Sequence, residues 1–573
     1  SITYESHNRP TNISLNGKEK QKNTFDGKGN LLEIENALGS KMIFKNNEMG
    51  LPVTIVQPDK STISIVYDKK GNITDYIDER NGRTQYIYDD LNRIIKVTDP
   101  NGNITQFTYD QADNIRTVTN GMGKIRTYEY NKSNKVTKIV DFDGSTIQRK
   151  YNVMDKPEVI IDQLGRETKL QYDSMWNLAR ITEPNGARTT YFYNENNHLS
   201  RIKDPNGNVK RYTYDGNGNR LSESDESGAV TYFSYDAAGR LIKAEGPDGM
   251  KYGYIYDAED NLIEVEDALG GKITMKYDAA GQLIYEKNQM GESRYYTYNI
   301  LGKVESIIDE AGRKTEYKYL PGGLLETVIH LGEIVEKYTY DANSNIKTYT
   351  NNEGFVLTYS YDSLNHITCI EGSGGEKNTY AYDVMGNIIS MTDGLGNITK
   401  YEYTLTGRLS RVINPLNDVT EYAYDECDNL IEICQYGKKE DGEKECHITR
   451  YERDLLGYVR TITDPLGLKE HYKYDSKGQL LEKIDKEGYL TRYGYTSQGD
   501  INHIQYADGR EVKLSYNPLR QLQELEDWLG TMKIETDLLG RAAKILYQDG
   551  KEVSYTYGKA GERTSITYKK RKK

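Results

Sequence analysis

Residues 235–241 read Tyr235-Asp236-Ala237-Ala238-Gly239-Arg240-Leu241, and near copies of this motif recur along the chain every 21 residues. Tyrosine fills the first position in unbroken register from Tyr67 to Tyr424. Counting back by the same period reaches Asn46, Phe25 and Tyr4. A fixed period of this length indicates one supersecondary unit that is copied many times. We therefore expect the fold to be set by the repeat.

Each unit carries two turn signals. Four residues after the tyrosine stands Gly, Asn or Asp, with Trp176 as the exception between residues 29 and 239. These residue types tolerate a positive φ at least cost, which predicts a tight turn. Ten residues later a second glycine follows, often within Asp-Pro-x-Gly, as at Asp99, Asp204 and Asp464. The residues expected to have positive φ include Gly239, Gly281, Gly302, Gly386, Asn92, Asn197 and Asn365.

The two segments between the turns are about six residues long, which suits strands and is too short for helices. They are rich in Tyr, Ile, Val and Thr. We predict an all-β fold in which tandem 21-residue repeats form one continuous antiparallel β-meander, with two strands per repeat and helix nearly absent. Because the period is odd, one turn must be even and the other odd or bulged. We expect a three-residue Asp-x-x-Gly loop and an even Asp-Pro-x-Gly turn.

The repeat tyrosine often has an aromatic partner two residues earlier, such as Tyr86, Phe107 or Tyr212. Residues i and i+2 share a face, so successive repeats lay down a double stripe of rings. The chain has 51 Tyr, 7 Phe and a mean hydropathy of −0.79, which suits a sheet without a thick apolar core. The expected structural anchors of the repeat are Tyr67, Tyr88, Tyr109, Tyr214, Tyr235, Tyr256, Tyr340, Tyr361, Tyr382, Tyr424, Gly239, Gly281, Gly302 and Gly386.

These motifs resemble the YD-repeat (RHS-repeat) family, which includes bacterial polymorphic toxins, shell components of insecticidal toxin complexes, wall-associated proteins and teneurins. The resemblance covers essentially the whole chain, through Tyr-Asp-x-x-Gly copies at Tyr67, Tyr235 and Tyr382 and the Asp-Pro-x-Gly turns. It implies a single sheet that spirals into a hollow shell, or β-cocoon, which in the toxins encloses a C-terminal effector domain.

We read residues 1–573 as one repeat array, with regular register over 4–424, a lengthened hairpin at about 434–448, repeats again over 453–568 and a basic tail at 569–573. After Tyr424 the next slot falls eight residues late, at Arg453. A second slip, one residue short, precedes Thr536. The family's shell-closing segment and effector are not recognisable in these residues, so we expect a segment of a larger protein.

Cys434 and Cys446 flank the lengthened hairpin, with Cys427 and His447 nearby. No Cys-x-x-Cys spacing supports a zinc site. A hairpin centred on Glu440 would place the two cysteines opposite each other and allow a disulfide, whereas a centre at residues 441–442 would misalign them. The sequence leaves both registers open.

No motif predicts catalysis, a cofactor or a metal. Asp215, Asn217, Asn219 and Glu226 mimic a calcium loop, but Arg220 occupies the position that requires glycine. No Ser/His/Asp or Cys/His arrangement or phosphate-binding loop stands out from the repeats. A net charge of −12 lacks the basic footprint of nucleic-acid binding, and no stretch is apolar enough for a membrane span.

Two functions fit these observations. The first is a non-catalytic shell segment that encapsulates and helps deliver a toxin or effector, with that effector or flanking shell segments as partners. The second is an extracellular or cell-surface adhesion module in which exposed tyrosines bind glycan or protein. Inward-facing or inter-strand tyrosines favour the container, and outward rows favour the binder. The resemblance implies a secreted or cell-surface bacterial protein.

Overall fold

The computed structural model describes residues 1–5, 8–15, 17–438 and 444–570. These residues form one antiparallel sheet of 54 strands in which consecutive strands pair. The only helix among them is a three-residue 3-10 turn, η1 (Pro247–Gly249), and no helix in the described part is long and apolar enough to cross a membrane. The predicted all-β meander is confirmed.

Two strands of five or six residues make up the regular repeat. The strands are β1 (Ile2–Tyr4), β2 (Pro10–Leu15), β3 (Lys18–Phe25), β4 (Leu31–Asn36), β5 (Lys41–Asn46), β6 (Pro52–Val56), β7 (Thr62–Tyr67), β8 (Ile73–Ile77), β9 (Arg83–Tyr88), β10 (Ile94–Thr98), β11 (Ile104–Tyr109), β12 (Ile115–Thr119), β13 (Ile125–Tyr130), β14 (Val136–Val140), β15 (Thr146–Tyr151), β16 (Pro157–Ile161), β17 (Glu167–Tyr172), β18 (Leu178–Thr182), β19 (Arg188–Tyr193), β20 (Leu199–Lys203), β21 (Val209–Tyr214), β22 (Arg220–Ser224), β23 (Val230–Tyr235), β24 (Leu241–Glu245), β25 (Lys251–Tyr256), β26 (Leu262–Glu266) and β27 (Lys272–Tyr277). They continue as β28 (Leu283–Lys287), β29 (Ser293–Tyr298), β30 (Val304–Ile308), β31 (Lys314–Tyr319), β32 (Leu325–His330), β33 (Glu333–Tyr340), β34 (Ile346–Asn351), β35 (Val356–Tyr361), β36 (Ile367–Gly372), β37 (Lys377–Tyr382), β38 (Ile388–Thr392), β39 (Ile398–Tyr403), β40 (Leu409–Ile413), β41 (Val419–Tyr424), β42 (Leu430–Lys438), β43 (Lys444–Arg453), β44 (Val459–Thr463), β45 (Lys469–Tyr474), β46 (Leu480–Ile484), β47 (Leu490–Tyr495), β48 (Ile501–Gln505), β49 (Glu511–Tyr516), β50 (Leu522–Asp527), β51 (Gly530–Thr536), β52 (Ala542–Tyr547), β53 (Lys551–Tyr557) and β54 (Arg563–Lys570).

The turns of the ribbon lie along two opposite edges. We call the edge with the turns that follow the repeat tyrosines, such as residues 89–93, the YD edge. The other edge, with turns such as residues 99–103, is the Asp-Pro edge. In both turns the first residue's N–H donates to the carbonyl of the fifth, and the fourth residue's N–H donates to the carbonyl of the first. The fourth residue has positive φ in both, as at Asn92 and Gly102.

The predicted positive φ values are confirmed at all four named glycines and all three asparagines, and Trp176 adopts the same conformation with φ 63°. The three-residue Asp-x-x-Gly loop is also confirmed, but the even Asp-Pro-x-Gly turn is wrong, because that turn is a three-residue loop as well. The residue that makes the 21-residue period odd lies instead in a β-bulge beside each repeat tyrosine. For example, Thr108 pairs with Thr117 while Tyr109 pairs with Ile115, which leaves Arg116 extra.

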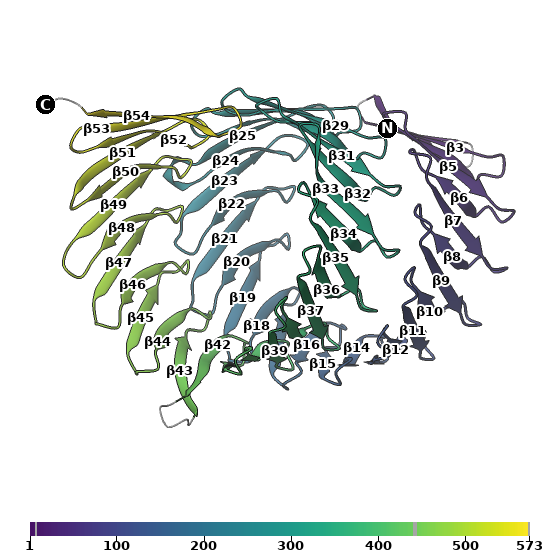
Figure 1. The fold of residues 1–573 in the computed structure, drawn as a ribbon, viewed down its shortest axis with the longest axis horizontal. Coiled ribbons are helices and arrows are strands. Elements are labelled where there is room, and N and C mark those ends of the chain that lie inside the picture. Colours follow the sequence, from purple (N-terminus) through teal and green to yellow (C-terminus); the bar gives the residue numbers. More distant parts are fainter. Residues whose placement is uncertain (6–7, 16, 439–443, 571–573) are drawn as a thin grey trace.

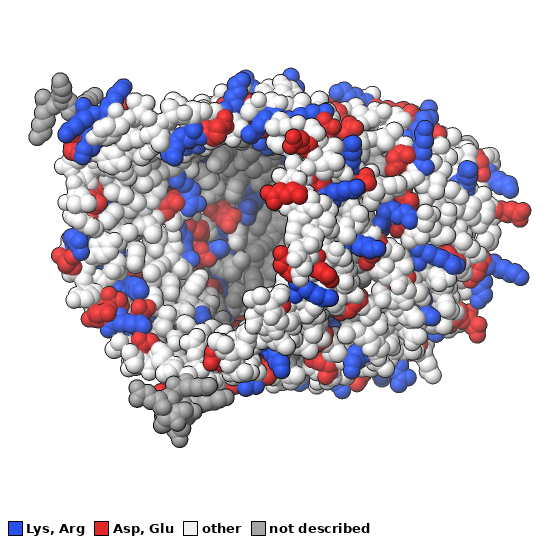
Figure 2. Space-filling model, viewed as in Figure 1, with Lys and Arg blue, Asp and Glu red and all other residues white. Residues whose placement is uncertain are grey.

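The sheet winds around itself, so that strands β19–β24 of the first winding lie beside β44–β50 of the second (Figure 1). Side-chain contacts between the windings join residues 240 to 264 positions apart, as in Asn101–Asp341 and Arg80–Ser344. One winding therefore takes about twelve repeats. The space-filling view shows a deep hollow bordered by the windings, with acidic and basic side chains on its visible wall (Figure 2). The predicted spiral into a hollow shell is confirmed.

The core is a thin stripe on one face of the sheet. The aromatic residue two positions before the repeat tyrosine pairs across strands with an aliphatic side chain, as in Phe107–Val118, Tyr128–Ile139 and Tyr191–Ile202. Strand residues on the opposite face are mostly polar, and no described side chain larger than a few atoms is fully buried. Cross-strand pairs on one face therefore replace a thick core.

Both register slips have a structural cause. In the first, β42 and β43 extend the ordinary hairpin on the Asp-Pro edge, and residues 439–443 at its end lie outside the described residues. In the second, Asp527 pairs directly with Gly530, so Trp528 and Leu529 form a two-residue turn in place of the usual three. That turn accounts for the missing residue before Thr536.

Candidate functional site

The repeat tyrosines link neighbouring strands through their hydroxyl groups. In most regular repeats the Tyr Oη donates a hydrogen bond to the backbone carbonyl of the residue fifteen positions earlier. Among the predicted anchors these bonds are Tyr67–Pro52 at 3.0 Å, Tyr88–Ile73 at 2.8 Å, Tyr109–Ile94 at 2.7 Å, Tyr214–Leu199 at 2.8 Å, Tyr235–Arg220 at 3.0 Å, and Tyr340–Leu325, Tyr361–Ile346, Tyr382–Ile367 and Tyr424–Leu409 at 2.7 Å.

The accepting carbonyl needs this donor because the backbone ladder has already ended. Ile94 begins β10 and pairs with Tyr88 on β9, but the ladder from β10 to β11 starts only at Lys96. Its carbonyl therefore lies beyond the reach of backbone N–H groups on β11, and the Tyr109 hydroxyl takes their place. Burial raises the pKa of Tyr109, as it does for Tyr67 and Tyr88, so these hydroxyls remain donors at neutral pH.

Two slots without tyrosine keep the same bond. The Asn46 side-chain amide donates to the Leu31 carbonyl at 2.8 Å, also fifteen residues earlier. Arg453, in the slot displaced by the lengthened hairpin, donates from Nε to the Leu430 carbonyl at 2.8 Å and from Nη1 to the Gly457 carbonyl at 2.8 Å. A donor other than tyrosine can therefore serve in this slot, although Phe25 fills it without one and the Asn23 amide donates to the Pro10 carbonyl instead, at 2.8 Å.

The aspartate after each tyrosine organises the YD turn. Asp236 Oδ1 accepts the backbone N–H groups of Ala238 at 2.9 Å and Arg240 at 3.0 Å. These bonds, with a further one from the Arg240 side chain, lower the pKa of Asp236. Asp215 has the same arrangement with Asn217 and Asn219. The calcium-like string is thus occupied by the ordinary turn of its repeat.

The residue that follows the positive-φ position links neighbouring YD turns, a role that was not predicted from the sequence. The Arg240 guanidinium bonds Asp236 in its own turn and Asp260 in the next YD turn, each at 2.7 Å, and stacks 4.9 Å from the centre of the Tyr256 ring. Arg93 repeats this arrangement with Asp89, Asp113 and Tyr109. Asparagines at the same position, such as Asn72, bond the next turn with an amide. The recurrence of Arg or Asn after the turn residue was the available signal.

The two windings meet along a seam in which the Asp-Pro edge of the first contacts the YD edge of the second. The ion pairs across it are Lys18–Glu259 at 2.9 Å, Arg166–Asp428 at 2.9 Å and Lys477–Asp225 at 2.9 Å. Hydrogen bonds join Asn101 to Asp341 at 2.9 Å, Asn206 to Asp454 at 3.1 Å and Gln498 to Asp248 at 2.8 Å. Turns that the local sequence places on opposite edges of the ribbon are therefore in contact across the seam.

One cavity on the seam gathers charged side chains. It has a volume of about 480 Å³ and is lined by Lys210, Glu223, Asp225, Glu226, Lys477 and Arg520, among others. These groups are already paired: Lys210 with Glu226 at 3.2 Å, Lys477 with Asp225 at 2.9 Å and Arg520 with Asp500 at 2.8 Å. Although burial opposes ionisation, bonds from Ser227 and Lys477 lower the pKa of Asp225, which favours its charged form. The charged side chains that line the cavity thus resemble a structural cluster of ion pairs.

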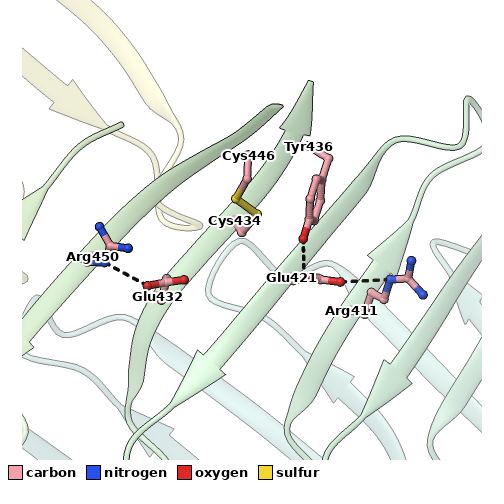
Figure 3. Close-up of a disulfide and its surroundings, with 7 residues drawn as sticks. All are labelled: Arg411, Glu421, Glu432, Cys434, Tyr436, Cys446 and Arg450. Carbon is pink, nitrogen blue, oxygen red and sulfur yellow. Dashed lines mark hydrogen bonds and ion pairs between the residues drawn. A yellow bond between two sulfur atoms is a disulfide. The ribbon is translucent and has the colours of Figure 1, made fainter. Parts of the chain in front are cut away.

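Cys434 and Cys446 form a disulfide in the lengthened hairpin, with their Cα atoms 5.6 Å apart (Figure 3). The register pairs Cys434 with Ile448 and Tyr436 with Cys446, so the cysteines are diagonal neighbours. Neither of the two registers considered from sequence is the observed one. Beside the disulfide, Tyr436 donates to Glu421 at 2.9 Å, and Glu421 also lies 3.5 Å from Arg411 (Figure 3).

The described residues contain no group of three or more His, Cys, Asp or Glu side chains that could hold a metal ion. Cys427 lies in the YD turn at 425–429, and burial raises the pKa of its thiol, which disfavours a reactive thiolate.

Comparisons with known proteins agree with this repeat architecture. The Teneurin YD-shell family model matches residues 287–441. The RHS Repeat family model matches residues 67–104, 88–121, 109–146, 176–209, 193–230, 214–249, 235–272, 256–289 and 474–511. No curated protein matches the sequence significantly.

Solved structures share the fold at low sequence identity. A crystal structure of TcdB2-TccC3 is similar, with a TM-score of 0.57 and 13% identity, over 94% of this chain and 40% of that one. A TcdB2-TccC3-Cdc42 structure is similar, with a TM-score of 0.58 and 12% identity, over 94% and 42%. This chain thus spans about two fifths of the length of those structures. The family matches, the tyrosine register and the wound sheet together make this chain a member of the YD-repeat, or RHS-repeat, family.

Proposed function

We propose that this chain is a structural, non-catalytic wall segment of a shell that encloses a toxin or effector and helps to deliver it. The observation that carries the proposal is a single-layer sheet wound into a hollow (Figure 2). The partners are then the enclosed effector and the flanking parts of the shell. The similar TcdB2-TccC3 structures support a shell of this type. A secreted or cell-surface location follows from the same proposal.

The side chains that most often carry chemistry elsewhere have structural partners here. The repeat tyrosines bond backbone carbonyls, and the turn aspartates accept backbone N–H groups. The charged groups around the seam cavity pair with one another. These contacts support the assignment of the predicted tyrosines and glycines as repeat anchors, and the proposal that the segment has no catalytic turnover.

The second candidate, an adhesion module for glycan or protein, would need rows of tyrosines presented outward. The repeat tyrosines are half-buried, and their hydroxyls are bound between strands. A few rings on the opposite face, such as Tyr232 and Tyr295, are exposed but do not form a continuous row. The arrangement of the tyrosines therefore favours the container.

A protease-protection assay tests the container. A small unfolded reporter with a protease site is fused to the C-terminus of this chain, and its cleavage is compared with that of the same reporter mixed with the chain but not fused. We expect the fused reporter to be cleaved at least about 10-fold more slowly, because excluded volume limits access of a folded protease. Equal rates would argue against enclosure. Saturable glycan binding that Tyr232→Ala abolishes would favour the adhesion module.

A further inference from the structure

The two broad faces of the wound sheet differ in composition. We call the face with the aromatic and aliphatic pairs the aromatic face and the opposite one the polar face. In β34 to β36 the aromatic face holds Tyr349 opposite Leu357 and Tyr359 opposite Ile370, with no charged side chain. Charged side chains nevertheless stud the outside of the near wall at these strands (Figures 1 and 2). The polar face is therefore the outer face of the wall, and neither the strand ladder nor the seam occupies it.

Arginines elsewhere on the polar face lie beside carboxylates on neighbouring strands. Arg411 in β40 lies between Glu402 in β39 and Glu421 in β41, at 3.1 and 3.5 Å. Arg450 and Arg492 each pair with a glutamate on the preceding strand, at 3.0 and 3.3 Å. Such cross-strand pairs of opposite charge stabilise an exposed sheet surface. The charge of each of these arginines is thus balanced within the chain.

Five cations on the polar face of four consecutive strands, β18 to β21, lack this pairing. We call them the cationic patch, and they are Arg180, Arg188, Arg201, Lys203 and Arg211. None of the five forms an ion pair with any residue that the structure describes. Arg188, Lys203 and Arg211 are exposed, and Arg180 and Arg201 are half-buried. A chain with a net charge of −12 thus concentrates unpaired positive charge at one place on its outer face.

The surroundings of Arg201 show how the patch differs from the rest of this face. Arg201 holds the same place in its repeat as Arg411, but its neighbours are Phe192, whose ring centre lies 3.7 Å from the Arg201 guanidinium carbon, and Arg211. Arg201 and Arg211 are directly opposite, and like charges in this arrangement destabilise a sheet. In Arg180 the buried Nε has no hydrogen-bond partner among the described residues. The patch therefore keeps hydrogen-bond donors and charge that the chain itself does not satisfy.

Threonine hydroxyls separate the cations along two adjacent rows of the sheet. The rows, read across consecutive strands, are Lys169–Thr182–Arg188 and Arg180–Thr190–Lys203. Lys169 also contacts Glu167, at 3.3 Å. Neighbouring strands are about 4.8 Å apart, so the backbones of the two cations in a row are separated by about 10 Å, with a neutral hydroxyl between them. Both rows thus present charged and neutral hydrogen-bonding groups in alternation.

We propose that the cationic patch binds a linear anionic polysaccharide in which carboxylate- or sulfate-bearing sugars alternate with neutral ones. The guanidinium groups bind the acidic groups of the polymer, because their planar forks match carboxylate and sulfate oxygens in pairs. Thr182 and Thr190, which lie between the cations, bond the hydroxyl groups of the neutral sugars. The alternation along each row thus matches the alternation along the polymer.

Two other polyanions fit the patch less well. An anionic membrane is held best where apolar side chains also insert, but β18 to β21 carry no exposed large apolar side chain. Single-stranded nucleic acid stacks on open aromatic rings, but Phe192, the one ring on the polar face of these four strands, is covered by Arg201. The proposed binding uses no tyrosine and does not depend on what the shell encloses, so its failure would leave the container proposal untouched.

The test titrates the full chain with hyaluronan oligosaccharides, in which a carboxylated sugar alternates with a neutral one, and measures the heat of binding at about 50 mM salt. The patch variant is Arg180→Gln/Arg201→Gln/Arg211→Gln. The matched control is Arg411→Gln/Arg450→Gln/Arg492→Gln, which removes the same charge from paired arginines of the same face. We expect the wild type to bind with a Kd below about 100 µM. The patch variant should bind at least about 10-fold more weakly, and the control should change by less than about 2-fold.

A single substitution tests the patch without a triple change. Arg211→Glu gives Arg201 the carboxylate neighbour that Arg411 has. We expect this variant to lose binding and to unfold at a higher temperature in circular dichroism, because an opposite-charge pair replaces a like-charge pair. Loss of binding together with a more stable fold separates a role in binding from a role in folding.

Several outcomes would overturn the proposal. They are equal binding by the wild type and the patch variant, no saturable binding by the wild type up to about 1 mM oligosaccharide, and equal binding of neutral dextran. Tighter binding of duplex DNA, or of vesicles that contain phosphatidylserine, than of hyaluronan would also overturn it and assign the patch to that partner.

Discussion

The regular array from Tyr67 to Tyr424 and the irregular segment from Tyr424 to Arg453 meet the same structural demand in different ways. In the array a tyrosine hydroxyl supplies the donor for the carbonyl that the backbone ladder leaves out. In the irregular segment an arginine supplies it, although the spacing has grown by eight residues. The repeat therefore tolerates a change of residue and of length, provided that a donor still reaches the carbonyl.

The place of the insertion is also informative. β42 and β43 extend from the Asp-Pro edge of the second winding (Figure 1), between the turns at residues 414–418 and 464–468. A hairpin of this length on the first winding's Asp-Pro edge would collide with the YD turns that pack there, such as residues 425–429 against Arg166. The extra length thus lies on a stretch of the Asp-Pro edge for which the contacts described above, among the described residues, place no second winding.

Acidification should have the largest effect on the stability of the regular array, because it protonates aspartates in turns along the whole array. Hydrogen bonds to backbone and side chains lower the pKa of turn aspartates such as Asp68, Asp89 and Asp236. A carboxylate with a lowered folded-state pKa stabilises the fold above its unfolded pKa, near 3.8, and this stabilisation is lost as pH falls through the folded value. We expect cooperative loss of the far-UV β signal below about pH 4.

Within the same titration the lengthened hairpin is the internal reference. The Cys434–Cys446 disulfide joins its two strands. Limited proteolysis by pepsin should therefore cut the regular turns before it separates β42 from β43. An array that keeps its β signal at pH 2 would show that the turn carboxylates contribute little.

The regular features were predictable from sequence because each depends on local residue types. Tyrosine spacing, strand length and positive φ at residues such as Gly239 and Asn92 all follow from the motif. The bulge beside the tyrosine was not predicted, since many residue types occupy it and no motif marks it. The seam depends on curvature accumulated over about twelve repeats, and no local motif encodes that angle. Arg166 and Asp428 therefore gave no sign in the sequence of being partners.

Removal of the disulfide should weaken the irregular segment by the next largest amount. The bridge closes a loop with a sequence separation of 12, for which chain-entropy estimates give about 3 kcal/mol. We expect Cys446→Ser to increase hydrogen exchange of β42 and β43 strongly while exchange in β9 to β12 is unchanged. Equal changes in both regions would show that the array couples over longer distances than a nearest-neighbour repeat.

Turn substitutions should give intermediate effects of opposite sign. Gly239 has φ 80°, so Gly239→Val forces a β-branched residue into the left-handed region and should cost about 1–2 kcal/mol. Trp176 already holds φ 63° without being glycine, so Trp176→Gly should relieve about 1 kcal/mol of backbone strain. Thermal unfolding followed by circular dichroism measures both. A stabilising Gly239→Val would contradict the turn assignment.

Removal of the hydrogen-bond donor from the tyrosine slot should have the smallest effect on the free energy of unfolding. It tests most directly whether the array and the irregular segment meet the same demand. Tyr109→Phe keeps the ring but removes the bond from the hydroxyl to the Ile94 carbonyl, 2.7 Å away. Because that carbonyl lies at a half-exposed strand end where water can replace the donor, we expect a loss of about 0.5–1.5 kcal/mol. Arg453→Ala removes two such bonds and should cost more, whereas Arg453→Gln retains a donor and should recover part of the loss. If Arg453→Leu, which keeps bulk without a donor, is as stable as wild type in chemical denaturation, then packing rather than hydrogen bonding defines the slot.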